Sequence, residues 1–276
     1  MNFPQFWARG RSGAFSVWRW SDASVDDAKI AAQAAAERLA AQFEANELTN
    51  DKYGYGNRPM REPVLRERRD ASGELAWAVT RNSYGSQVLN SSIALFVDVD
   101  FPEQKSKGPG LFGSLFGKHA EPEDPAKAPM AKAAAWAQGH PGWNWRIYRT
   151  KAGVRLLATH ALFHPDDQVC EQVFAAMGAD PLYRKLCQTQ KCFRARLTPK
   201  PWRCGIGHPP ARWPFQDHRE EHAFANWDAN YQAASRAKAT CQLLDKGSGV
   251  VHEELREMVE LHDEATRAGS VGFALA

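Results

Sequence analysis

The sequence predicts an α+β fold, in which helices pack on a mostly antiparallel central sheet and a pair of helices closes the chain. Two observations support this prediction. Apolar stretches of strand length recur near residues 15–20, 75–100 and 143–160. Within the last stretch, a glycine-containing turn at 151–153 joins 143–150 to 154–160 as a hairpin. Segments with high helix propensity lie between and after these strands without regular βαβ alternation.

The elements are expected in the following order. Ser24 is suited to cap a helix, because Asp26 and Asp27 follow in its first turn and alanines then extend it to Glu47. The predicted strands are 15–20, 75–81, 85–89, 93–100, 143–150, 154–160 and 192–197. The remaining predicted helices are 126–138, 165–177, 181–188, 217–245 and 251–267.

The domain organisation is predicted from changes in composition. Residues 1–215 are expected to form the α+β core, and residues 216–276 a helical extension packed on it. Residues 103–129 are rich in Gly, Pro, Lys and Glu, which indicates a flexible surface insertion within the core. The repeated Leu-Phe-Gly at 111–113 and 115–117 leaves open a docking element for a partner protein.

Composition narrows the class of protein. The chain has 276 residues, of which 43% are hydrophobic, so a globular fold is expected. A net charge of +3 excludes a histone-like polycation but not local basic clusters. The sequence has no apolar run long enough for a membrane span and no signal-peptide pattern at its start. Five cysteines without framework spacing indicate a reducing compartment, so a cytoplasmic location is expected.

The strongest chemical signal is the apolar strand that ends in Asp98 and Asp100, directly before Phe101 and Pro102. Alternate residues of a strand share a face, so the two carboxylates are expected to point the same way. Paired carboxylates suit Mg²⁺ or Mn²⁺, and such ions support phosphoryl and nucleotidyl transfer. The alternative is a strand that runs into a solvated acidic turn.

Two basic segments are candidates for phosphate binding. The predicted hairpin carries Thr150 and Lys151 before its glycine and Arg155 after it, so its N–H groups and cations suit a triphosphate. Further along, four cations lie within ten residues: Arg194, Arg196, Lys200 and Arg203. Like charges on one strand face repel, which favours an anionic ligand. For the hairpin the alternative is that its arginines are solvated strand residues. For the second segment it is surface charge or pairing with carboxylates such as Asp98.

The order of these segments resembles the archaeo-eukaryotic primase superfamily over roughly residues 95–203. That superfamily has an apolar strand ending in D-x-D, a glycine hairpin with a histidine, and an acid followed by basic residues. The resemblance implies that Asp98, Asp100 and Asp180 bind the catalytic metals. It also implies that Thr150 and Lys151 approach the triphosphate, and that Arg194, Arg196 and Lys200 bind nucleotide or template phosphates. Arg155 stands where the hairpin histidine is usual, and an arginine does not titrate near neutral pH.

The function predicted from these features is nucleotide binding, with two-metal nucleotidyl transfer on nucleic acid as its catalytic form. The expected partners are a nucleoside triphosphate and nucleic acid, and the expected cofactor is Mg²⁺ or Mn²⁺. A non-catalytic nucleotide- or nucleic-acid-binding protein and a scaffold protein are the alternatives. Trp202 and Trp213 are suited either to stacking on bases or to core packing. Zinc is not expected, because Cys187, Cys192, Cys204 and His208 lack the tight C-x-x-C spacing.

Overall fold

The computed structural model describes residues 1–46, 59–102 and 124–276. They form an α+β protein whose sheets are mostly antiparallel, with six α-helices in the described residues. The chain divides into two compact units, each made of two separate segments. Unit 1 contains Met1–Ile93 and Leu186–Lys238, and unit 2 contains Ala94–Lys185 and Ala239–Ala276.

Unit 1 contains a two-stranded hairpin with its helix and a four-stranded antiparallel sheet in the order β3-β4-β5-β9. Its strands are β1 (Phe6–Ser12), β2 (Phe15–Ser21), β3 (Val64–Arg69), β4 (Leu75–Arg81), β5 (Gln87–Ser91) and β9 (Phe193–Arg196). Its helices are α1 (Val25–Glu44), the 3₁₀ turn η1 (Pro201–Cys204) and α5 (His218–Ser235). Helix α4 (Pro181–Gln190) contains the point at which the chain enters unit 1 from unit 2.

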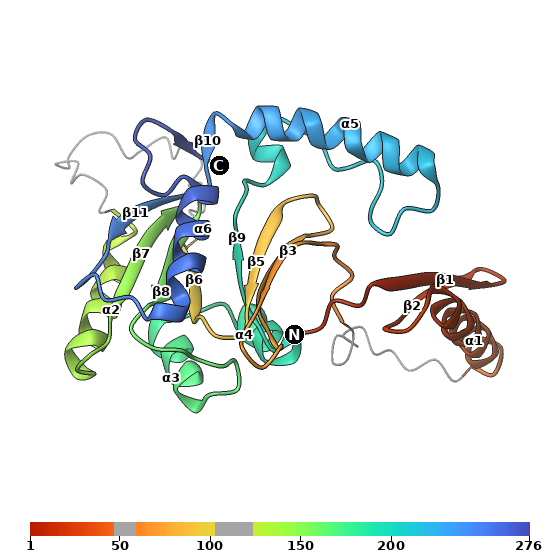
Figure 1. Ribbon diagram of the computed structural model, residues 1–276, viewed down its shortest axis with the longest axis horizontal. Helices are drawn as coiled ribbons and strands as arrows, with labels where there is room; N and C mark the ends of the chain where they lie inside the picture. The colour runs from red at the N-terminus through yellow and green to blue at the C-terminus, as the bar shows by residue number, and fades with distance from the viewer. Residues whose placement is uncertain (47–58, 103–123) are drawn as a thin grey trace, which may run out of the picture. The chain divides into compact units, whose positions relative to one another are not determined.

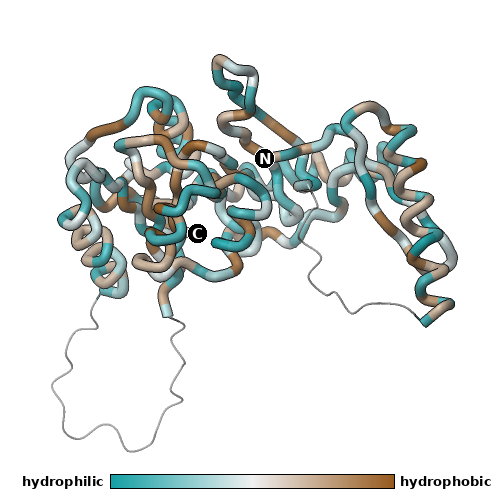
Figure 2. The backbone as a smooth tube through the Cα atoms, turned by 90° about the horizontal axis from the view of Figure 1, so that it is seen from below, coloured by the Kyte–Doolittle hydropathy of each residue, from teal (hydrophilic) through white to brown (hydrophobic). Residues whose placement is uncertain are grey.

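The β1–β2 hairpin packs one of its faces on α1 (Figure 1). Ser24 caps this helix as predicted, because its hydroxyl accepts a hydrogen bond from the backbone N–H of Asp27. Hydrophobic and hydrophilic residues alternate along α1 in Figure 2. Small residues permit close packing at the contact: a Cβ on Gly10 would lie 2.1 Å from the carbonyl oxygen of Ala32. A glycine is therefore required at this point of β1.

Unit 2 contains a second four-stranded antiparallel sheet, in the order β11-β7-β8-β6. Its strands are β6 (Phe96–Asp100), β7 (Trp145–Thr150), β8 (Gly153–Ala158), β11 (Cys241–Asp245) and β12 (Ala274–Leu275), the last pairing with β10 (Lys238–Ala239). Its helices are α2 (Lys127–Gly139), α3 (Gln168–Met177), the 3₁₀ turn η2 (Glu253–Leu255) and α6 (Arg256–Thr266). Helix α6 crosses one face of the sheet (Figure 1).

Several sequence predictions are confirmed within two or three residues, including β4, the β7–β8 hairpin and helix α3. The single central sheet is corrected to two sheets, since β5 and β6 pair with different partners. The predicted helix 217–245 ends at Ser235, and β11 then follows it because residues 241–245 pair with β7. Strand β1 was not predicted. None of the helices in the described residues is long and apolar enough to span a membrane.

The predicted domain boundary at residue 215 does not coincide with the two units. Helix α5 belongs to unit 1, where Asp228 forms an ion pair with Arg81 of β4. Residues 239–276 belong to unit 2, where they supply β11 and α6. The predicted insertion lies outside the described residues from 103 to 123, and its remaining residues include the first turn of α2.

Candidate functional site

The D-x-D strand end in unit 2 is occupied by an internal ion pair. Asp98 of β6 and Arg155 of β8 are direct cross-strand neighbours. Both carboxylate oxygens of Asp98 accept hydrogen bonds from Arg155, at 2.8 Å from Nε and 3.0 Å from Nη2. The Arg155 side chain is 1% exposed and that of Asp98 is 37% exposed. The sequence therefore places Arg155 correctly in the hairpin, and in the structure its guanidinium is engaged by Asp98 rather than left open to a phosphate.

A polar network extends from this ion pair beneath α6. Arg155 Nη1 lies 3.3 Å from Nε2 of His262, whose Nδ1 lies 3.1 Å from Asp263. Tyr148 donates to Asp263 at 2.7 Å, and Arg146 also forms an ion pair with this carboxylate. Charged groups at this depth are tolerated because each of them meets an opposite charge or a hydrogen-bonding partner.

The pKa shifts agree with a closed structural network. Burial opposes the charge on Arg155, but the Asp98 carboxylate outweighs it, and the pKa of Arg155 is raised. Burial lowers the pKa of His262, the Asp263 hydrogen bond opposes that effect, and the Arg155 charge adds to it. His262 is therefore neutral at neutral pH, and it packs against the rings of Phe96 and Tyr148.

The three predicted metal ligands are not brought together as a set. Within the described ranges, no group of three or more His, Cys, Asp or Glu side chains is placed to hold a metal ion. Asp100 is exposed at the end of β6. Asp180 instead caps α4, where its Oδ1 accepts from the backbone N–H of Tyr183 at 2.8 Å. The donor set does not fit a two-metal centre, because Arg155 already engages both oxygens of Asp98.

The other predicted phosphate ligands lie in different settings. In unit 2, Thr150 is half-buried at the end of β7, and Lys151 is exposed in the following turn. In unit 1, Arg194 follows the alternative of carboxylate pairing, since its Nη2 donates to both oxygens of Glu62 at 2.8 Å. The remaining cations are half-buried in and beyond β9: Arg196, Lys200 and Arg203. Of these, Lys200 lies 5.5 Å from the ring centre of Trp202.

The four sulfur and imidazole groups considered for zinc are also placed by the structure. Cys187 and Cys192 are buried, whereas Cys204 is partly exposed and His208 is exposed. The ring of His208 packs 5.2 Å from that of Trp202. Burial raises the pKa of Cys192 to about 11, so this thiol stays protonated at neutral pH.

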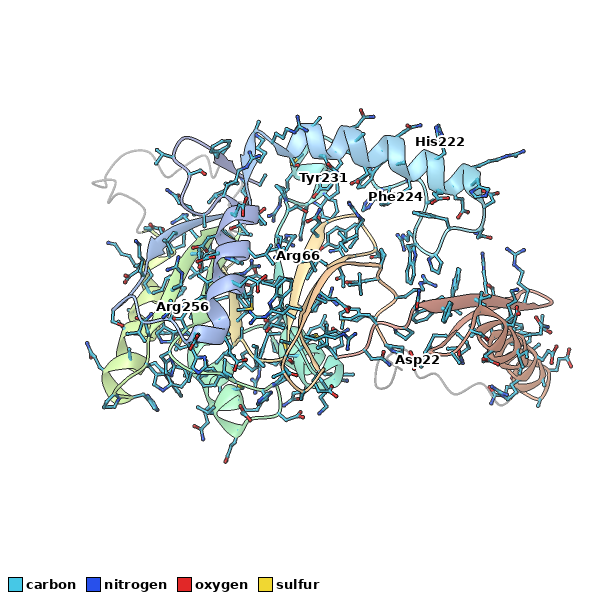
Figure 3. All side chains as sticks on the ribbon, viewed as in Figure 1. Asp22, Arg66, His222, Phe224, Tyr231 and Arg256 are labelled. Atoms are coloured by element: carbon cyan, nitrogen blue, oxygen red, sulfur yellow. The ribbon has the colours of Figure 1, made fainter. Side chains whose placement is uncertain are left out.

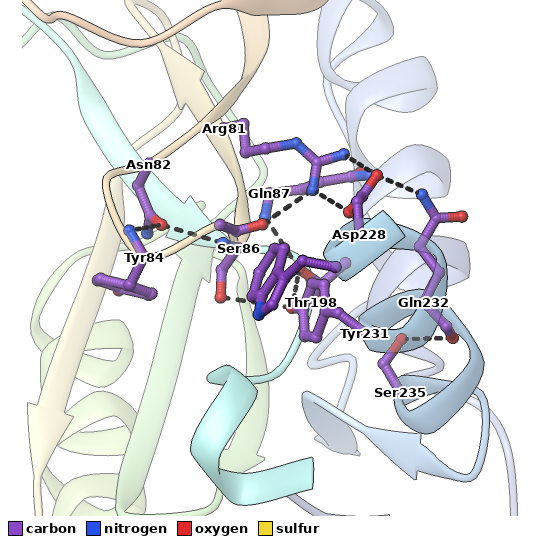
Figure 4. Close-up of polar contacts among 12 residues, drawn as sticks. Arg81, Asn82, Tyr84, Ser86, Gln87, Thr198, Asp228, Tyr231, Gln232 and Ser235 are labelled. Atoms are coloured by element: carbon purple, nitrogen blue, oxygen red, sulfur yellow. Dashed lines mark hydrogen bonds and ion pairs between the residues drawn. The ribbon is translucent and has the colours of Figure 1, made fainter. Parts of the chain in front are cut away.

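Unit 1 contains a second polar network, which joins α5 to the β4–β5 turn and to the segment after β9 (Figure 4). Arg81 binds both oxygens of Asp228, at 2.6 and 3.0 Å, and donates to the carbonyl of Gly85. The hydroxyl of Tyr231 lies 2.8 Å from that of Thr198. These bonds hold α5 at a fixed position beside the turn.

Helix α5 presents aromatic side chains to this region. Phe224 and Tyr231 point from one side of the helix and His222 from the other (Figure 3). Residues 224 and 231 are seven apart, so they fall on one helix face. Trp227 lies between them and stacks on Tyr231, with ring centres 5.2 Å apart. Phe215 extends the group, 5.1 Å from Phe224.

The aromatic group borders a pocket of about 280 Å³ within unit 1. We call it the arginine–aromatic pocket. Its cations are Arg61, Arg81 and Arg212, and its aromatic walls are Trp213, Phe215 and Phe224. The other lining residues are Pro63, Leu65, Asn82, Ser83, Pro209 and Ala211. This volume is close to the lower end of the range for small-molecule sites, about 300–1,000 Å³.

The cations of this pocket differ in their partners. Arg81 is paired with Asp228 and lies 5.5 Å from the ring centre of Phe224. Arg61 and Arg212 form no ion pair with a carboxylate of the described chain, and Arg61 stacks on Trp18 at 4.5 Å. Burial lowers the pKa of Arg61, and repulsion from Arg212 and Arg9 lowers it further. The lining of the pocket therefore contains two cations that have no carboxylate partner in the described residues.

Sequence reasoning identified Trp213 as a candidate for stacking but missed Arg61 and Arg212. These arginines lie about 150 positions apart in the chain, and only the packing of the two segments of unit 1 brings them together. A local sequence signal was present only in the neighbouring β1–β2 hairpin. There Arg9 and Arg11 alternate with small or apolar residues, and Trp18 and Trp20 alternate with polar ones.

Comparison with known proteins gives no assignment. No family model, curated protein or solved structure matches the chain.

Proposed function

We propose that the protein binds a nucleotide or nucleic acid at the arginine–aromatic pocket of unit 1, without transferring it. The observation that supports this proposal is the pair Arg61 and Arg212, which repel each other in the lining of an aromatic pocket and have no carboxylate partner in the described residues. A phosphate group removes that repulsion and accepts hydrogen bonds from both guanidinium groups.

The walls of the pocket favour a nucleotide over a simple anion. Three aromatic side chains, Trp213, Phe215 and Phe224, line the pocket, and base–aromatic stacking contributes about 1–3 kcal/mol per base. Asn82 and Ser83 also line the pocket and supply polar groups for the edge of the base. The volume suits one base rather than a larger ligand.

Binding is preferred to nucleotidyl transfer because of the chemistry of unit 2. Transfer by the D-x-D pair requires Asp98 to exchange its two hydrogen bonds with Arg155 for a metal ion. That exchange leaves the charge of a buried arginine without its partner, which is strongly unfavourable. The proposed binding site needs no such rearrangement.

The test is a titration of the intact protein with ATP and AMP, followed by calorimetry and tryptophan fluorescence, with and without EDTA. We expect metal-independent binding that weakens at least tenfold in the double variant Arg61→Ala, Arg212→Ala. Arg38→Ala is the matched control, because Arg38 is an exposed cation on α1.

Two results would contradict the proposal. One is unchanged affinity in the double variant. The other is binding or nucleotide incorporation that requires Mn²⁺ and disappears in Asp100→Ala, at the exposed member of the D-x-D pair, which would instead support transfer in unit 2.

A further inference from the structure

We infer that the ligand of the arginine–aromatic pocket is a single-stranded polynucleotide, whose backbone continues from the pocket across the open face of the β1–β2 hairpin. This inference rests on the proposed function and extends it to a second surface and to a ligand class. It follows from the side chains that the hairpin directs away from α1.

The open face of the hairpin is identified by strand register. Ala8 and Gly10 pack against α1, so the odd-numbered residues of β1 point the other way. Trp7 pairs with Trp20, and Arg9 with Trp18. Directly paired residues share a face, so the hairpin face consists of the buried Trp7 and the more exposed Arg9, Arg11, Ser16, Trp18 and Trp20.

This face alternates cations with aromatic rings. Arg9 and Arg11 are exposed, and Trp18 and Trp20 are partly exposed. Neither arginine forms an ion pair with a carboxylate among the residues that the structure describes. Arg9 donates to the hydroxyl of Ser16, which fixes its position without neutralising its charge. Ring faces next to uncompensated cations are the two features by which proteins bind unpaired bases and their phosphates.

Arg61 connects the hairpin face to the pocket. Its guanidinium stacks on Trp18 of the hairpin at 4.5 Å, and the same side chain lines the pocket. Its pKa is lowered first by burial and then by repulsion from Arg212 and Arg9, so the hairpin and the pocket each place a cation near Arg61. Cations on both surfaces match the repeated charge of a polynucleotide better than the charge of a single nucleotide.

The stacking surfaces select the single strand, and the length and charge of unit 1 suit a polynucleotide. Stacking on Trp18 and in the pocket requires bases that are not paired, so a duplex cannot use these surfaces. The seven residues of β1 span about 24 Å, enough for several nucleotides. Unit 1 as a whole is basic, with 21 Lys and Arg against 15 Asp and Glu, whereas unit 2 has 14 against 17.

The test measures fluorescence anisotropy of labelled oligothymidylates from two to twelve nucleotides at several salt concentrations, beside the mononucleotide titration. We expect affinity to rise with length and then level off, and duplex DNA to bind more weakly. In Arg9→Ala, Arg11→Ala, oligonucleotide affinity should fall at least tenfold, while mononucleotide affinity should change far less, because neither residue lines the pocket. The slope of log K against log salt should become shallower by about 1.4, since each lost phosphate contact contributes about 0.7.

Two control variants accompany this test. Arg9→Lys, Arg11→Lys keeps the charges and should restore the salt slope, and Arg38→Ala should bind as the wild type does. If the mononucleotide binds but longer strands bind no tighter, or if the Arg9 and Arg11 variants leave oligonucleotide affinity unchanged, the inference is wrong and the proposed function stands. If duplex binds as tightly as single strand, the inference is also wrong. If neither nucleotide nor oligonucleotide binds, both fail.

Discussion

Unit 1 and unit 2 place buried or half-buried arginines in opposite electrostatic situations. In unit 2, Arg155 is fully buried and both oxygens of Asp98 neutralise it. In unit 1, Arg61 faces Arg212 and Arg9 and has no carboxylate partner in the described residues. An arginine whose charge is matched inside the fold contributes to structure, and one whose charge is not matched is available for a ligand. The two sites thus separate a structural role from a binding role for the same residue type.

The largest expected effect is on the stability of unit 2. Asp98→Ala leaves the Arg155 charge buried without its partner, which should cost about 3–5 kcal/mol of unfolding free energy. Denaturant unfolding followed by circular dichroism measures this cost. Glu260→Ala, at an exposed position of α6, is the control. Unchanged stability in Asp98→Ala would show that the pair is not structural.

A second variant tests whether the loss of stability depends on breaking a buried ion pair or on the location of that pair in unit 2. Arg194 lies in unit 1, but its ion pair with Glu62 is largely buried, with side chains 19% and 13% exposed. Glu62→Ala should therefore also destabilise the protein, by roughly 3 kcal/mol. The same unfolding measurement applies. A loss below about 0.5 kcal/mol is typical of a surface substitution, and it would show that a neutralised arginine need not have a structural role.

The pH dependence of stability should report on His262. Its pKa is lowered in the folded state by burial and by Arg155, with Asp263 opposing, from an ordinary value of 6.5. As pH falls below about 6.5 the unfolded chain takes up a proton that the folded chain does not, so stability decreases by up to about 1.4 kcal/mol per pH unit.

The variant His262→Gln should not lose stability in this way as pH falls below about 6.5. Any remaining loss should occur only at the much lower pH at which carboxylates titrate. The lowered pKa of Asp263 acts only in that lower range, below its ordinary value of 3.8. Unfolding midpoints measured from pH 7.5 to 5 in both proteins check the prediction. Parallel curves for the two would contradict it.

The smallest expected effect concerns Arg212. It is exposed and has no ion pair in the described part of the chain, so Arg212→Ala should change the unfolding free energy by less than about 0.5 kcal/mol. Loss of its repulsion with Arg61 acts in the stabilising direction. A large loss of stability would instead show that Arg212 has a structural role, as Arg155 has.

Local patterns predicted much of the secondary structure. The Ser24 cap, the β7–β8 hairpin and helix α3 each depend on residues close together in sequence, and all three are confirmed. Strand β11 was missed because residues 241–245 follow a helical segment closely. Its strand conformation is stabilised by pairing with β7, about 95 residues earlier in the chain.

For the candidate site, the sequence alone determined which segments carry concentrated charge and aromatic side chains. It did not determine which charges are neutralised. That was decided by tertiary structure, because Asp98 meets Arg155 across a strand pair, and Glu62 meets Arg194 from a segment about 130 residues away. The free energy of a buried charge depends on neighbours within a few ångströms, and the chain brings those neighbours together only when it folds.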